Sequence, residues 1–175
     1  MQNKNNNEQK RISYSEFKIW NECTHKHKLI YIDKVPYYSS NEYTSFGTAI
    51  HESCEKLIPD NSVDPHQIFE EAFLRELKEV KDQGLELNTK LVKEMRQQAK
   101  LICAQLLPAV TDYFGNFEVF SIEEALLEEM KSIKSFGKKF KGFIDLVIKT
   151  PDDKYHIIDW KTCSWGWDAR KKNNK

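Results

Sequence analysis

Apolar residues recur every three or four positions through the first two thirds of the chain, which is the spacing of helices that bury one face. This pattern predicts four helices, over residues 13–30, 46–57, 65–80 and 88–114. Ser13 and Glu16 have the spacing of a capping box at the start of the first helix. Pro108 is expected to kink or split the fourth helix, because proline cannot donate the helical hydrogen bond.

After Gly115 the apolar residues alternate with polar ones, which is typical of strands. The expected strands cover residues 118–123, 125–133, 140–149 and 155–161, and the second either continues the first after a bend or pairs with it. Residues 151–153 are expected to form the turn before the last strand. A helical half followed by strands predicts an α+β domain with a mainly antiparallel or a mixed sheet.

Two polar segments complete this outline. Residues 1–10 are Asn-rich and are expected to form a disordered tail, and residues 33–44 are expected to form a loop. The remaining residues, 11–175, are predicted to form a single domain, because 175 residues suit one domain.

Composition indicates an ordinary globular protein of the cytoplasm. Hydrophobic residues make up 39% and charged residues 31% of the chain. No apolar run approaches the ~20 residues of a membrane span, and the first residues lack the apolar stretch of a signal peptide. The four cysteines form no C-x-x-C pair, which favours a reduced, intracellular protein without disulfides.

The 27 basic and 27 acidic residues cancel, but they are unevenly distributed. Residues 51–130 hold 8 basic and 17 acidic residues, whereas residues 131–175 hold 12 and 5. Such asymmetry is a sign of nucleic-acid contact. On charge alone, solvated lysine-rich faces that offset an acidic helical region are an equally good interpretation.

Two carboxylates interrupt the last two apolar strands. A turn at 151–153 would place Asp145 opposite Asp159, with Cβ atoms ~4.5–5.5 Å apart. Carboxylates so close repel unless a cation such as Mg²⁺ or Mn²⁺ lies between them, and Lys161 would share the face of Asp159. The alternative is a buried Asp–Lys salt bridge, with the second aspartate satisfied by backbone amides.

The residues that surround these carboxylates resemble the motif of a known family. Gly142–Asp145 followed by Asp159–Thr162 resembles the core motif of the PD-(D/E)XK nucleases, and in particular that of the RecB-like exonuclease branch. That branch includes the AddB nuclease domain and CRISPR-associated RecB-like exonucleases. Its upstream Gly-x-x-x-His motif is matched by Gly47–His51. Its N-terminal helix pattern is matched by Ser13, Ser15, Phe17, Trp20 and Cys23.

The resemblance implies a fold and an activity. The fold would be an α/β/α restriction-endonuclease-like core, and the activity would be Mg²⁺- or Mn²⁺-dependent hydrolysis of DNA. An exonuclease in recombination, repair or phage DNA processing is expected, in a bacterial cell or a phage-infected host. A helicase or a recombination protein is an implied partner. The alternative is a non-catalytic DNA-binding relative, or an inactive N-terminal fragment of such a nuclease.

The resemblance also implies roles for individual residues. The implied metal ligands are His51, Asp145, Asp159 and the backbone carbonyl of Trp160. Lys161 matches the catalytic lysine, and Glu123 or Glu124 lies where many members carry an additional acidic residue. The implied DNA contacts are Lys141, Arg170, Lys171 and Lys172.

Several family features have no counterpart in the sequence. The Gln-x-x-x-Tyr motif that usually follows the lysine is missing, so the domain is expected to be incomplete at its C-terminus. Cys23 matches the first ligand of the family's iron–sulfur cluster, but the C-terminal cysteine trio is missing, so no cluster is expected. No Gly-x-x-x-x-Gly-Lys-[Ser/Thr] loop is present, so no ATP site is expected. Trp160, Trp165 and Trp167 are expected to pack under the sheet rather than to stack on bases.

Overall fold

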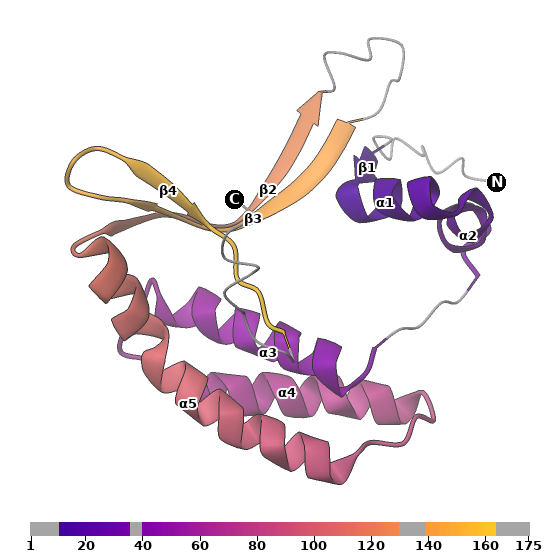
Figure 1. Ribbon diagram of the computed structural model, residues 1–175, viewed down its shortest axis with the longest axis horizontal. Coiled ribbons are helices and arrows are strands. Elements are labelled where there is room, and N and C mark those ends of the chain that lie inside the picture. The colour runs from indigo at the N-terminus through magenta and orange to yellow at the C-terminus, as the bar shows by residue number, and fades with distance from the viewer. Residues whose placement is uncertain (1–10, 36–39, 130–138, 164–175) are drawn as a thin grey trace, which may run out of the picture. The chain divides into compact units, whose positions relative to one another are not determined.

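The computed structural model describes residues 11–35, 40–129 and 139–163, and the chain divides into two compact units (Figure 1). The first unit comprises residues 1–38 and 123–144, and the second comprises 39–122 and 145–175. The fold is α+β with a mixed sheet, as predicted. The tail at 1–10 lies outside the described residues. No helix within the described ranges is long and apolar enough to cross a membrane.

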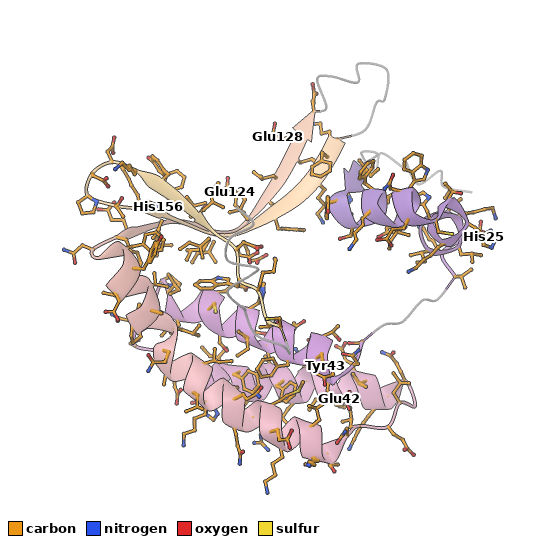
Figure 2. All side chains as sticks on the ribbon, in the orientation of Figure 1. His25, Glu42, Tyr43, Glu124, Glu128 and His156 are labelled. Atoms are coloured by element: carbon orange, nitrogen blue, oxygen red, sulfur yellow. The ribbon has the colours of Figure 1, made fainter. Side chains whose placement is uncertain are left out.

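The second unit contains three long helices that lie side by side (Figure 1): α3 (Glu42–Leu57), α4 (Pro65–Asp82) and α5 (Thr89–Phe114). The last two agree closely with the prediction. The first begins earlier than predicted, because Asn41 forms a capping box with Thr44 that stops the preceding loop at residue 41. Glu42, labelled in Figure 2, accepts a hydrogen bond at 2.6 Å from the backbone N–H of Asn88, which is the N-cap of α5.

The core of these helices is aromatic at its centre. Phe46 of α3 meets Phe69 and Phe73 of α4 edge-on, at ring-centroid distances of 5.5 and 6.1 Å. Buried Ala, Met and Cys side chains fill the space around these rings. Burial raises the pKa of the Cys54 thiol to about 12 and that of Cys103 to about 11, so both cysteines are inert core residues.

Pro108 does not split α5, which contradicts one of the two expected outcomes. The helix continues through it to Phe114, and ends where Gly115 takes a φ of 70°. Pro108 lies on an exposed position, while Cys103 and Val110 on either side of it are buried. Packing of this buried face outweighs the one hydrogen bond that proline removes.

The sheet is built around one long central strand. Its strands are β1 (Arg11–Ser13), β2 (Glu118–Glu129), β3 (Lys139–Lys149) and β4 (Tyr155–Ile158). In the first unit β3 pairs in parallel with β1, and in the second unit it pairs antiparallel with β4. The other neighbour of β3 is β2. β1 was not predicted, because three residues beside a polar tail show no alternation.

The two strands expected around residue 124 are one strand, β2, which bends. Glu123 within it has a φ of 47°, a conformation that kinks a strand without ending it. This is the first of the two alternatives that the sequence left open.

The register of the β3–β4 hairpin is the predicted one. Leu146 pairs with Ile158 and Ile148 pairs with His156, and the backbone N–H of Thr150 donates to Lys154 at 3.0 Å across the turn. The ladder ends at Leu146, one position before the aspartates would be opposite each other. β4 is therefore shorter than predicted, and the residues after Ile158 leave the strand.

In the first unit the predicted helix over 13–30 is interrupted. It consists of α1 (Tyr14–Glu22), α2 (Thr24–His27) and the π-helical turn η1 (Lys28–Ile32). Cys23 separates α1 from α2 with an extended backbone, and its sulfur caps α2 by accepting from the N–H of Lys26. Ser13 caps α1 as predicted, but the Glu16 carboxylate binds His27 at 3.1 Å.

Candidate active site

The segment after β4 is anchored by one aromatic side chain. Trp160 is half-buried and packs against both hydrophobic clusters of the second unit. One cluster lies among α3, α4 and α5, and the other contains Leu146 and Ile148 of β3. Trp160 therefore has the packing role that was predicted for it, and it fixes its neighbours Asp159 and Lys161 in the second unit.

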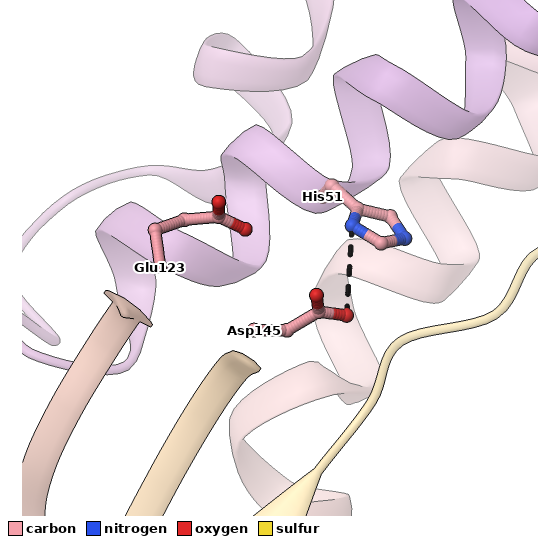
Figure 3. Close-up of side chains that lie close together, drawn as sticks. All are labelled: His51, Glu123 and Asp145. Atoms are coloured by element: carbon pink, nitrogen blue, oxygen red, sulfur yellow. Dashed lines mark ion pairs between the residues drawn. The ribbon is translucent and has the colours of Figure 1, made fainter. Parts of the chain in front are cut away.

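Asp145 is held by two partners from distant parts of the sequence. Its Oδ2 accepts a hydrogen bond from the backbone N–H of Trp160 at 2.7 Å. The same oxygen lies 3.8 Å from Nδ1 of His51 on α3 (Figure 3). The Asp145 side chain is 13% exposed and that of His51 is 29% exposed. This carboxylate is thus oriented and still reached by solvent.

A glycine on α3 lets the motif segment approach the helix closely. A Cβ atom built on Gly47 would lie 3.0 Å from Oγ1 of Thr162. Gly47 is one helical turn before His51, so the Gly-x-x-x-His spacing places the close approach and the histidine on the same face of α3. The contact between Gly47 and Thr162 was not predicted, because no local pattern links residues so far apart.

Gly47→Ala should disturb the site more than the fold. The added methyl group would push on Thr162 and shift Asp159–Lys161, so we expect the activity of this site to fall about tenfold to 10²-fold, the cost of small misplacements in active sites. Thermal unfolding should change little, because alanine favours the helix. Thr48→Ala on the next position is the matched control. Activity of Gly47→Ala equal to that of the control would contradict this role of the glycine.

Asp159 and Lys161 form an exposed ion pair. Lys161 Nζ lies 2.5 Å from Asp159 Oδ1, and the two side chains are 59% and 58% exposed. Their contact agrees with the expectation that they share a face. The expectation that Asp159 lies within the last strand is wrong, because the ladder ends at Ile158. The contacts match the alternative arrangement, in which one aspartate pairs with lysine and the other with a backbone amide, but the Asp–Lys pair is exposed rather than buried.

The His51–Asp145 pair fits a divalent cation. Two ligand atoms that each lie ~2.1 Å from one ion are at most ~4.2 Å apart. The measured 3.8 Å between Nδ1 and Oδ2 lies within that limit. The carboxylate suits Mg²⁺ or Mn²⁺, and the imidazole is a common ligand of transition-metal ions. The second unit therefore contains an acidic and histidine pair with the chemistry and spacing of a metal site.

Glu123 and Glu124 are both exposed residues of β2 and belong to the first unit. Glu123 follows directly after Ile122, which packs on the core of the second unit. Figure 3 draws Glu123 as well as the pair, and His51, Glu123 and Asp145 each carry an atom of a type that binds metals. Figure 2 labels Glu124.

Another carboxylate beside the histidine was not identified from the sequence. Glu52 lines a depression of about 510 Å³ along α3 together with Gly47 and His51. Lys56 Nζ and one guanidinium nitrogen of Arg75 each lie 2.6 Å from a carboxylate oxygen of Glu52. The hydrogen bond from Lys56 is the main reason that the pKa of Glu52 is lowered. Because two cations neutralise it, Glu52 is a structural residue rather than a metal ligand.

The remaining predicted site residues are more dispersed. Lys141 lies on β3 in the first unit, where its Nζ is 4.5 Å from the ring centroid of Phe143. Cys23 is exposed with a free thiol. Five of the residues discussed in the sequence analysis lie outside the described residues: Trp165, Trp167, Arg170, Lys171 and Lys172.

Comparison with known proteins agrees with this geometry. No curated protein and no solved structure matches the chain significantly. A family model does match, and it spans residues 11–173, from β1 past the Asp159–Lys161 segment. Helices in the N-terminal half and a mixed sheet that ends just before this segment are consistent with the restriction-endonuclease-like fold. The chain therefore belongs to the PD-(D/E)XK nuclease superfamily, whose members are hydrolases that act on nucleic acids.

Proposed function

We propose that the chain is a Mg²⁺- or Mn²⁺-dependent deoxyribonuclease that degrades DNA from its ends. The observation that carries this proposal is the position of Asp145. It lies between His51 of α3 and the backbone N–H of Trp160, which is flanked by Asp159 and Lys161. Helix α3 and the segment after β4 thus meet at one oriented carboxylate on β3.

The metal ligands in this proposal are His51, Asp145, Asp159 and the carbonyl oxygen of Trp160. A bound Mg²⁺ or Mn²⁺ would supply an activated water and stabilise the charge on the scissile phosphate. Asp159 now binds Lys161, so it must exchange this partner for the metal when it acts as a ligand. Its exposure leaves the carboxylate free to make that exchange.

Lys161 has the catalytic role in this proposal. Its ammonium group is exposed, and release from Asp159 would let it contact a phosphate oxygen or the attacking water. We assign it the stabilisation of developing negative charge, because a fixed cation beside the phosphate lowers the barrier without a proton transfer.

The resemblance implies an additional acidic residue on the strand before the hairpin, and we propose Glu123 or Glu124 for this role. Glu123 has a φ of 47°, and bends of this type in strands often re-aim a side chain.

The pathway assignments rest on the resemblance to RecB-like exonucleases. DNA recombination, repair or phage DNA processing is the proposed setting, with a helicase or recombination protein as partner. Lys141, Arg170, Lys171 and Lys172 are the proposed contacts to DNA phosphates.

The test is a cleavage assay on four labelled DNA substrates. Linear and closed circular DNA, each single- and double-stranded, are incubated with Mg²⁺, with Mn²⁺ or with EDTA. We expect progressive shortening of linear DNA with either metal, intact circles, and no reaction in EDTA. Cleavage of the circular DNA would show that the protein is an endonuclease rather than an exonuclease. Binding without cleavage would favour the non-catalytic relative, and the absence of both would overturn the proposal.

A further inference from the structure

Strands β1 and β3 of the first unit share one basic and aromatic side. Side chains alternate along a strand, so Lys139, Lys141 and Phe143 of β3 share one side. The parallel register places Arg11 of β1 beside Lys139 and Ser13 beside Lys141. Three cations and an aromatic ring therefore lie together on two adjacent strands.

The opposite face of the same strands is apolar. Ile12 of β1 pairs with Phe140 of β3, and Ile144 follows on the same side. All three are half-buried. The alternation assigns this apolar face to packing. On the basic face Arg11 and Phe143 are exposed, while Lys139 and Lys141 are half-buried.

The cations of the basic face have no acidic partners among the described residues. Lys149 and Lys154 of the second unit each bind an aspartate in their own hairpin, at 2.5 and 2.6 Å. By contrast, none of the ion pairs found within the described residues involves Arg11, Lys139 or Lys141. Within the described residues, these three cations therefore lack the close ion-pair partners that Lys149 and Lys154 have.

Phe143 is an exposed aromatic residue in the middle of a strand. It is 55% exposed, and Lys141 Nζ lies 4.5 Å from its ring centroid. The cation–π contact holds the ring in place at a modest energetic gain. An exposed ring beside several cations is the combination with which proteins bind single strands, because unpaired bases stack on the ring while the phosphates meet the charges.

We propose that this basic face binds single-stranded nucleic acid, with Phe143 stacking on a base and Arg11, Lys139 and Lys141 contacting phosphates. The inference rests on the nucleic-acid substrate of the proposed function and adds a preference for unpaired strands. Duplex DNA could meet the same cations, but its bases are stacked inside the helix and leave Phe143 without a partner.

The first measurement tests the stacking. Fluorescence anisotropy of labelled oligothymidine and of a duplex is recorded in EDTA, so that binding is independent of cleavage. Phe143→Ala should weaken single-strand binding about 5- to 150-fold and leave duplex binding unchanged. Phe143→Trp should retain binding. The control is Phe120→Ala, since Phe120 is 61% exposed on β2 in the second unit.

The second measurement tests the phosphate contacts. The double variant Lys139→Ala/Lys141→Ala should reduce the slope of log K against log salt by about 1.4, which is the loss of two single-strand phosphate contacts. The control Lys93→Ala/Lys100→Ala removes two exposed lysines of α5 and should leave the slope unchanged. Circular dichroism of each variant verifies that it is folded.

The outcomes separate this inference from the proposed function. Equal weakening of single-strand and duplex binding by Phe143→Ala would overturn the stacking, as would failure of Phe143→Trp to bind. An unchanged salt slope in the lysine variant would overturn the phosphate contacts. Binding with these signatures and no cleavage under Mg²⁺ or Mn²⁺ would sustain the basic face while rejecting the nuclease.

Discussion

Replacing Asp145 with asparagine should reduce metal-dependent cleavage about 10³-fold or more. The change removes the negative charge that attracts the cation, and metal stabilisation of a transition state is worth several kcal/mol, with ~1.4 kcal/mol for each factor of ten. The asparagine carbonyl can still accept the hydrogen bond from Trp160, so the fold should survive. Thermal unfolding with and without Mn²⁺ measures metal binding, and the metal-induced rise in Tm should be lost in this variant.

Asp112→Asn is the matched control for this experiment. Asp112 is an exposed aspartate on α5 and should leave both cleavage and the metal-induced rise in Tm unchanged. If Asp145→Asn cleaved DNA with native metal dependence, the His51–Asp145 pair would be a structural contact and the site would lie elsewhere.

Lys161→Met should reduce cleavage about 10²- to 10³-fold while the metal still binds. Loss of a single group that stabilises transition-state charge has this typical cost. Methionine keeps an unbranched chain of similar length without the charge, and Lys161 is exposed, so the stability of the fold should change little. Single-turnover rates at saturating metal, together with the metal-induced rise in Tm, separate a loss of chemistry from a loss of metal.

Two further variants define how Lys161 acts. Lys161→Arg keeps a permanent positive charge and cannot act as a base, so recovery of part of the activity identifies the charge as the active feature. Lys154→Met is the control, because Lys154 binds Asp152 at 2.6 Å with the same two-residue spacing as Lys161 and Asp159. An arginine variant as inactive as the methionine variant would instead assign proton transfer to Lys161.

The hairpin was predictable because its signals are local. The turn at residues 151–153, flanked by alternating apolar residues, determines which residues of β3 and β4 are opposite each other. Helices α4 and α5 were equally predictable, since their apolar residues recur every three or four positions. Local periodicity and turn signals thus sufficed for most of the second unit.

Features that depend on tertiary contacts were missed. The break at Cys23 lies within a run of apolar residues whose spacing predicts one continuous helix. The hydrogen bond by which the Cys23 sulfur caps α2 is visible only in the structure. β1 exists because β3 offers a parallel edge to three residues. The exposure of Asp159 depends on where the ladder stops, which the spacing of apolar residues does not reveal.

The anchoring of Trp160 between two hydrophobic clusters has a consequence for biosynthesis. Helices α3 to α5 are made first and can begin to pack their Phe46, Phe69 and Phe73 core as they emerge. His51 is synthesised about a hundred residues before Asp145 and Trp160, the other residues of this contact. Until Trp160 has docked, Asp145 lacks its backbone donor and Lys161 has no fixed position. A nascent chain would therefore hold a folded helical layer before its candidate active site is assembled.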